Sequence, residues 1–131
     1  MYLTITGAVI AITSIIIVLA ATALTSINEH QSEPLDPDKT LEGIRSNAAY
    51  LAIYERYPDA IERINHNDYQ LDIEIGVMNS TSGNQLIMRI YAHSEHDYNV
   101  NAQCVDSLGD TAQHVDGLFV NEFIRTTDCV E

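Results

Sequence analysis

The chain has 131 residues, with 19 acidic and six basic side chains and a formal net charge of −13. Nucleic-acid binding depends on clustered lysine and arginine, and docking on anionic lipid headgroups does too, so this composition argues against both. A solvated outer domain, divalent cations or a basic partner all remain compatible with it.

An uncharged apolar segment runs from Leu3 to Ile27. As a helix it would extend about 37 Å, against a hydrocarbon core of roughly 30 Å. The sequence therefore predicts a transmembrane anchor over 1–27, a polar linker over 28–36 and a folded domain over 37–131. A cleaved secretory signal is the alternative: Ala21-Thr22-Ala23 could supply the cleavage site, but a basic n-region is missing.

Three small residues, Gly7, Ala11 and Ser14, fall close to one face of this predicted helix and would allow other membrane helices to approach. The first basic residue is Lys39, and the linker before it is acidic, which places the domain outside by the positive-inside rule. We therefore expect a single-pass cell-membrane protein with an extracytoplasmic C-terminal domain. Its expected partners are the lipid membrane and other membrane subunits, and no nucleic acid.

The chain has two cysteines, Cys104 and Cys129, and no CxxC motif. An even count in a small extracytoplasmic domain predicts one disulfide, and two buried free thiols are the alternative. Asn79-Ser80-Thr81 is a glycosylation sequon in a polar turn, so Asn79 is a candidate acceptor.

After the linker, Asp36 and Pro37 form a helix start, with Asp36 as the N-cap. The helical spacing of apolar residues continues to Tyr57, where Pro58 ends the helix. This amphipathic pattern comprises Leu41, Ile44, Ala48, Leu51 and Ala52. A second short helix is predicted over 58–64. Tyr50, Tyr54 and Tyr57 share another face. They could form a binding stripe, and a stripe that covers the sheet or lies at the membrane interface is the commoner explanation.

A β-hairpin follows, because apolar and polar residues alternate over 69–77 and again over 86–92. Pairing Val77 with Leu86 sets Glu74 opposite Arg89, an opposite-charge pair on the outer face. A third strand is predicted over 98–105, and a loop over 106–116.

The last element, 118–125, is ambiguous between strand and helix. A helix capped by Asp116 is favoured, because it groups apolar residues on the inner side. These are Phe119, Val120, Phe123 and Ile124. The predicted fold class is α+β: an N-terminal transmembrane helix, then a small domain with an amphipathic helix, an antiparallel β-meander and a C-terminal helix.

The segment 93–97 (HSEHD) places His93 and His96 beside two carboxylates, which are suitable donors for zinc or copper. Two histidines three residues apart point to the same site on a helix, but this segment is predicted to lie between strands. The default interpretation is therefore that both are solvated loop residues. Calcium loops are not favoured, because neither Asp36-x-Asp38 nor Asp106-x-x-x-Asp110 continues into the loop pattern with glycine at position 6 and glutamate at position 12. The sequence contains no phosphate-binding loop, nucleophile elbow or Cys–His arrangement, so we expect neither a cofactor nor an enzyme.

The segments 50–64 (YLAIYERYPDAIERI) and 114–131 (HVDGLFVNEFIRTTDCVE) resemble uncharacterised small single-span membrane proteins of ammonia-oxidising archaea. Such cells carry a multi-subunit membrane ammonia monooxygenase with small accessory subunits. The resemblance implies that this chain could belong to such a complex, and it supplies no functional residues. The leading expectation is a non-catalytic, membrane-anchored interaction module or accessory subunit. The alternative is a membrane-tethered domain that binds a metal or a small ligand.

Overall fold

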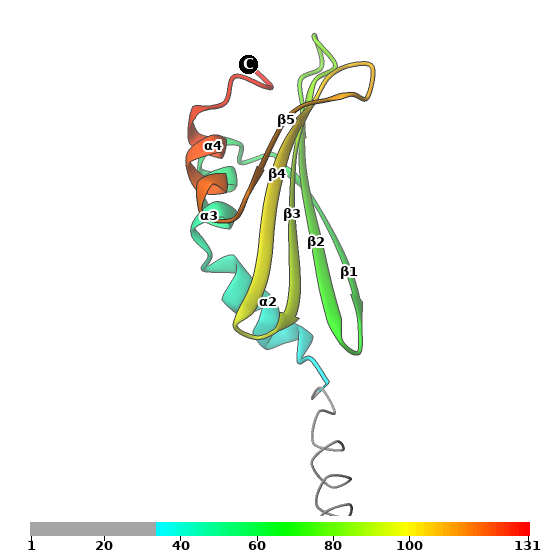
Figure 1. The fold of residues 1–131 in the computed structure, drawn as a ribbon, viewed down its shortest axis with the longest axis vertical. Coiled ribbons are helices and arrows are strands. Elements are labelled where there is room, and N and C mark those ends of the chain that lie inside the picture. The colour runs from blue at the N-terminus through cyan, green and yellow to red at the C-terminus, as the bar shows by residue number, and fades with distance from the viewer. Residues whose placement is uncertain (1–33) are drawn as a thin grey trace, which may run out of the picture. The chain divides into compact units, whose positions relative to one another are not determined.

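The computed structural model describes residues 34–131, where a five-stranded antiparallel sheet carries helices on one face (Figure 1). The strands follow the chain in the order β1-β2-β3-β4-β5. The elements are α2 (Pro37–Arg45), α3 (Ala48–Arg56), β1 (Ile61–Asn67), β2 (Gln70–Met78), β3 (Gln85–Ser94), β4 (Asp97–Val105), β5 (Thr111–Asp116), the 3-10 turn η1 (Gly117–Phe119) and α4 (Val120–Thr126). The predicted α+β class with an antiparallel meander is confirmed for this part of the chain.

The predicted anchor over 1–27, with Gly7, Ala11 and Ser14, lies outside the described residues. Within 34–131, none of the helices has the length and hydropathy needed to cross a bilayer.

The predicted helix start is confirmed, since the Asp36 carboxylate accepts hydrogen bonds from the backbone N–H groups of Asp38 and Lys39. The prediction of a single helix to Tyr57 is wrong in the middle of that segment. It breaks after Arg45, and the Asn47 side chain caps a second helix by accepting from the Ala49 N–H at 2.9 Å.

This break changes which side chains of the second helix are buried. Ala49, Ala52 and Ile53 enter the core, whereas Ala48 is exposed and Leu51 is 54% exposed. A continuous helix would keep one apolar stripe. The capped break restarts the helical phase, so the stripe predicted through Ala48 and Leu51 is shifted by one residue.

The predicted β2–β3 hairpin is confirmed in its register: Val77 lies opposite Leu86, and Glu74 lies opposite Arg89. The third predicted strand is β4. Two strands were not predicted. β1 occupies most of the segment expected to be a short helix, 58–64, and β5 lies in the segment expected to be a loop, 106–116.

The C-terminal element is a helix, as favoured, although its start differs from the prediction. Asp116 ends β5 and makes no side-chain capping bond, and η1 precedes α4. Val120 and Ile124 are buried, but Phe119 lies in the 3-10 turn and is 74% exposed. Phe119 is therefore not part of the inner face.

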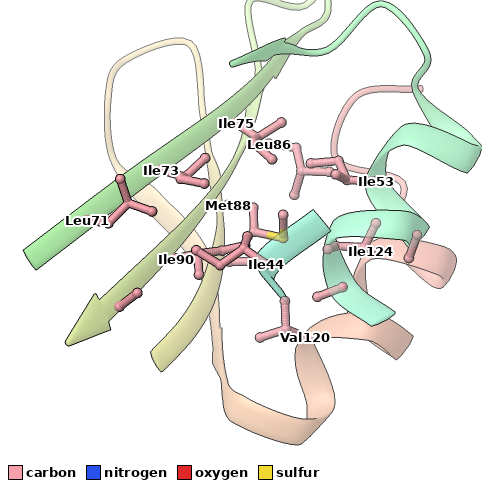
Figure 2. Packing of buried hydrophobic residues seen from close by; sticks show 14 of the residues in the cluster. Ile44, Ile53, Leu71, Ile73, Ile75, Leu86, Met88, Ile90, Val120 and Ile124 are labelled. Atoms are coloured by element: carbon pink, nitrogen blue, oxygen red, sulfur yellow. The ribbon is translucent and has the colours of Figure 1, made fainter. Parts of the chain in front are cut away.

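The core lies between the helices and the inner face of β2, β3 and β4, and Figure 2 shows its centre. Its fully buried large residues from the strands are Leu71, Ile73, Ile75, Leu86, Met88 and Ile90, and those from the helices are Ile44, Ile53, Val120 and Ile124. The predicted disulfide is present: Cys104 on β4 joins Cys129 beyond α4, with a Cα–Cα distance of 5.8 Å. It holds the C-terminal segment against the sheet.

Candidate interaction surface

The sheet face opposite the helices, here called the open face, presents side chains in rows across the strands. One row is charged and runs through Arg63, Glu74, Arg89, Asn101 and Asp116. The next row is partly apolar and runs through Ile61, Gly76, Ile87, Gln103 and His114. Each row follows from the strand register, because alternate residues of a strand point to the same face.

Glu74 is shared between two arginines in the charged row. The Arg89 Nε donates to one carboxylate oxygen at 3.0 Å, and the Arg63 guanidinium lies 3.6 Å from the other. The Arg63 side chain is 75% exposed, against 35% for Arg89. Arg63 is therefore the more weakly held of the two and has N–H donors facing solvent.

Gly76 opens a hollow in the apolar row. A Cβ atom placed on Gly76 would meet no heavy atom within 4 Å, so the space above this residue is open. Ile61 and Met78 flank it and are 67% and 64% exposed. The hollow has a volume of about 130 Å³ and is also bordered by Arg63, Glu74 and Gln85.

A second hollow, of about 420 Å³, adjoins the first across β1 and shares Ile61, Gly76, Val77 and Met78 with it. It extends to the turn between α3 and β1, where Tyr57 lies. The Tyr57 hydroxyl is buried and finds no hydrogen-bond partner among residues 34–131. The two adjoining hollows are here called the apolar depression, after the four residues that they share. It lies between the open face and the α3–β1 turn, and charged side chains, Arg56, Asp59, Arg63 and Glu74, border it.

A tyrosine–carboxylate cluster lies on the helix side of β1. The Glu62 carboxylate accepts hydrogen bonds from the Tyr50 hydroxyl at 2.7 Å and the Tyr54 hydroxyl at 3.3 Å, and Arg45 lies 3.9 Å away. Burial, and then the nearby charge of Glu62, raise the pKa of Tyr54 well above its usual range. Two residues of the predicted tyrosine stripe, Tyr50 and Tyr54, therefore anchor α3 to the edge of the sheet, and Tyr57 does not take part in this cluster.

Among residues 34–131, no third His, Cys, Asp or Glu side chain joins the predicted metal ligands His93 and His96. His93 is exposed near the end of β3, and His96 is exposed in the short turn to β4. Within residues 34–131 no three His, Cys, Asp or Glu side chains are arranged to hold a metal ion. Asp106 instead orders its own loop, because its carboxylate accepts from the backbone N–H groups of Leu108 and Asp110.

Asn79, the predicted glycan acceptor, lies in the β2–β3 turn and is half-buried. Its Nδ2 atom, which would carry the glycan, donates to the backbone oxygen of Glu131 at 2.9 Å. Its Oδ1 atom accepts from the N–H groups of Thr81 and Ser82. Glycosylation at Asn79 stays a prediction, and it would require the bond to Glu131 to be given up.

One feature of the sequence, the glycine at position 76, indicates the depression. An isolated glycine within an alternating strand pattern, as at Gly76, indicates a bulge or a close approach of another chain. The contribution of Ile61 could not be inferred, because β1 was expected to be a helix. Comparisons with protein-family models, with curated proteins and with solved structures found no match for this chain.

Proposed function

We propose that residues 34–131 form a non-catalytic protein-interaction domain, held at the extracytoplasmic side of a membrane by an anchor over 1–27. In this proposal the chain is an accessory subunit of a larger membrane complex, of which an archaeal ammonia monooxygenase is one candidate. The observation that carries the proposal is the apolar depression around Gly76 on the open face.

The size of the hollow supports a protein side chain as its occupant. An enclosed apolar cavity of about 150 Å³ accepts benzene, and the hollow at Gly76 measures about 130 Å³. One aliphatic or aromatic side chain of a partner therefore fits it. Covering Ile61 and Met78 removes exposed apolar surface from water, at roughly 25 cal/mol per Å².

The neighbouring charged row defines a second requirement. Ile61 and Arg63 are two residues apart on one strand, so their side chains are about 7 Å apart on the same face. An extended partner segment has the same repeat. It would place an apolar side chain in the hollow and, two residues along, a hydrogen-bond acceptor such as a carboxylate at the exposed guanidinium of Arg63.

The glycine offers a test that separates binding from folding. Gly76→Val fills the hollow, yet its Cβ meets nothing within 4 Å and valine favours strands, so the fold should be unchanged or more stable. Asn99→Val, on the open face but away from the hollow, is the matched control.

The full chain, tagged and extracted from native membranes in mild detergent, is examined by blue-native electrophoresis and mass spectrometry. We expect the wild type and Asn99→Val to migrate with a stoichiometric partner, and Gly76→Val to retain less than about a tenth of it, equivalent to about 1.4 kcal/mol or more. A wild-type chain that migrates alone would refute the accessory-subunit proposal. Full retention by Gly76→Val would refute the assignment of the hollow as the binding site.

A further inference from the structure

The β1 edge of the sheet differs from the β5 edge in ways that matter for pairing. β1 pairs with β2 over seven consecutive residues without a register shift, whereas β5 is shorter and its pairing with β4 shifts at Cys104/Val105. Bulges and short edge strands protect a sheet against added strands. β1 has no such bulge in its pairing with β2 and contains neither lysine nor proline. Its one inward-facing charged side chain, Glu62, is held by Tyr50, Tyr54 and Arg45.

The helices of the described chain reach β1 at Glu62, which Tyr50, Tyr54 and Arg45 contact, and leave most of the strand exposed. The helix–strand contacts are mainly with β3, β4 and β5, on the side of the sheet away from β1 (Figure 1). Six of the seven β1 residues are exposed, and Glu62 is half-buried. Ile64 faces the helix side, opposite the fully buried Ile73, yet Ile64 itself is 38% exposed. The hydrophobic core thus reaches the edge of the sheet without being closed there.

We infer that the occupant of this edge is β1 of a second copy of the chain, paired antiparallel about a two-fold axis at Ile64. Such a pairing is isologous and continues the two sheets into one, with both helix layers on the same side. This inference goes beyond the proposed function, since it concerns the backbone edge of β1 and a different partner. Arg63 borders both surfaces, whereas Gly76 belongs to the open face alone.

The β1 sequence is self-complementary in this register. Ile64 lies opposite Ile64 of the second copy, which closes the core at the edge. Glu62 lies opposite His66 of the second copy, and Arg63 opposite Asn65 of the second copy. Each pair shares a face of the sheet, as antiparallel pairing requires, and two of them join groups that can hydrogen-bond.

The neighbouring registers are less favourable. Centring the pair on Arg63 sets two guanidinium groups side by side, which is destabilising. Centring it on Asn65 places Ile64 against His66 and leaves the apolar side chain without an apolar neighbour. A one-residue slip of one strand would pair helix-side residues with open-face residues. The register at Ile64 is therefore the specific one.

A pair of seven-residue strands buries less than the roughly 1,600 Å² of a typical stable complex. We therefore expect weak association in dilute detergent and substantial pairing where chains are concentrated in a bilayer. This expectation decides the assay: cross-linking of the full chain at high density in phosphatidylcholine proteoliposomes.

Single cysteines report the register under mild oxidation, with Cys104 and Cys129 already joined to each other. We expect Ile64→Cys chains to form a covalent dimer in more than about half of the protein, since opposite Cβ atoms lie about 5 Å apart. Arg63→Cys alone and Asn65→Cys alone should give at least about fivefold less dimer, and a mixture of the two should recover it. Equal yields at all positions, or no dimer with Ile64→Cys, would overturn the inference.

A charge substitution provides a second measurement that does not depend on introduced thiols. Ile64→Glu sets two carboxylates opposite each other and adds no amine or thiol. It should reduce by about tenfold the energy transfer between donor- and acceptor-labelled chains in the proteoliposomes, whereas Gln113→Glu, on the exposed β5 edge, should leave the energy transfer unchanged. Gln113 lies opposite Cys104 and so also faces the helix side. Both variants keep Gly76, so loss of the dimer with retention of the open-face partner would separate this inference from the proposed function.

Discussion

Glu62 is the residue through which the helices reach the outer edge of the sheet. Its carboxylate is bound by Tyr50 and Tyr54 of α3, whose ring centroids are 5.0 Å apart. Burial and the hydrogen bond to Glu62 raise the pKa of Tyr50, and burial with the charge of Glu62 raises that of Tyr54. In the folded state both phenols therefore keep their protons above the ordinary pKa of 10.0.

This shift predicts a loss of stability in alkali. Above about pH 10 the folded chain binds more protons than the unfolded chain, so the free energy of unfolding falls as pH rises toward the folded pKa. Tyr54→Phe removes one of these groups and should make the fall shallower. At neutral pH it should cost only about 0.5–1 kcal/mol, because the bond it removes is long.

The measurement is urea unfolding of the full chain between about pH 8 and pH 11. Tyr69→Phe is the matched control, because Tyr69 is 57% exposed and lies outside the cluster. If the free energy of unfolding fell with pH at the same slope in Tyr54→Phe and Tyr69→Phe, burial and Glu62 would not be raising the pKa of Tyr54.

At the scale of elements, the β2–β3 hairpin could be predicted because two independent patterns agree. The alternation of apolar residues and the opposition of Glu74 to Arg89 require the same register, which the structure has. The two edge strands could not be predicted in this way. Neither β1 nor β5 has a fully covered face, so their sequences carry no alternation. In β1, apolar residues at 61 and 64 fit a helical spacing equally well, and only pairing with β2 decides between the two.

The hollow at the candidate site could not be predicted for the same reason, because it depends on β1 being a strand. The hollow needs Ile61 beside Gly76, a long-range neighbour that exists only once β1 is a strand. The break at Asn47 is a similar case. Asparagine is an ordinary N-cap residue, but within an apolar stripe of helical spacing its cap competes with a continuous helix. Burial of Ala49, Ala52 and Ile53 in the core favours the break.

The disulfide is predicted to stabilise α4 and the C-terminal segment more than the central hairpin. Cys104 and Cys129 are 25 residues apart, and closing such a loop contributes about 3 kcal/mol in the chain-entropy account. Both cysteines are buried, so the variant Cys104→Ala with Cys129→Ala also loses packing. We expect the free energy of unfolding to fall by about 3–4 kcal/mol.

Native-state hydrogen exchange locates this effect. Amides of α4 should exchange faster by a larger factor than those of β2 and β3. A reductant should reproduce the change in the wild type and have no effect on the double variant. Uniform acceleration throughout the domain would mean that the bridge stabilises only the global fold and does not tether α4.

For the whole molecule, the negative charge greatly exceeds what the cations can neutralise. All six basic side chains lie in the described part, and each is within 3.9 Å of a carboxylate. Most of these pairs are exposed, where an ion pair is worth about 0–1 kcal/mol. The remaining carboxylates repel one another, and a charge of −13 weakens the compact state.

Salt should therefore stabilise this protein. Raising ionic strength from about 0.01 M to 1 M shortens the Debye length from roughly 30 Å to 3 Å, which screens long-range repulsion more than it weakens contact ion pairs. We expect the unfolding midpoint of the full chain in non-ionic detergent at pH 7 to rise by several degrees over this range, followed by circular dichroism. Near the isoelectric point of about 4.4 the net charge vanishes, and the salt effect should vanish with it. A midpoint that falls with salt at pH 7 would mean that the ion pairs, including those of Glu74 with Arg63 and Arg89 in the charged row, outweigh the repulsion, and that the acidic surface is not a source of instability.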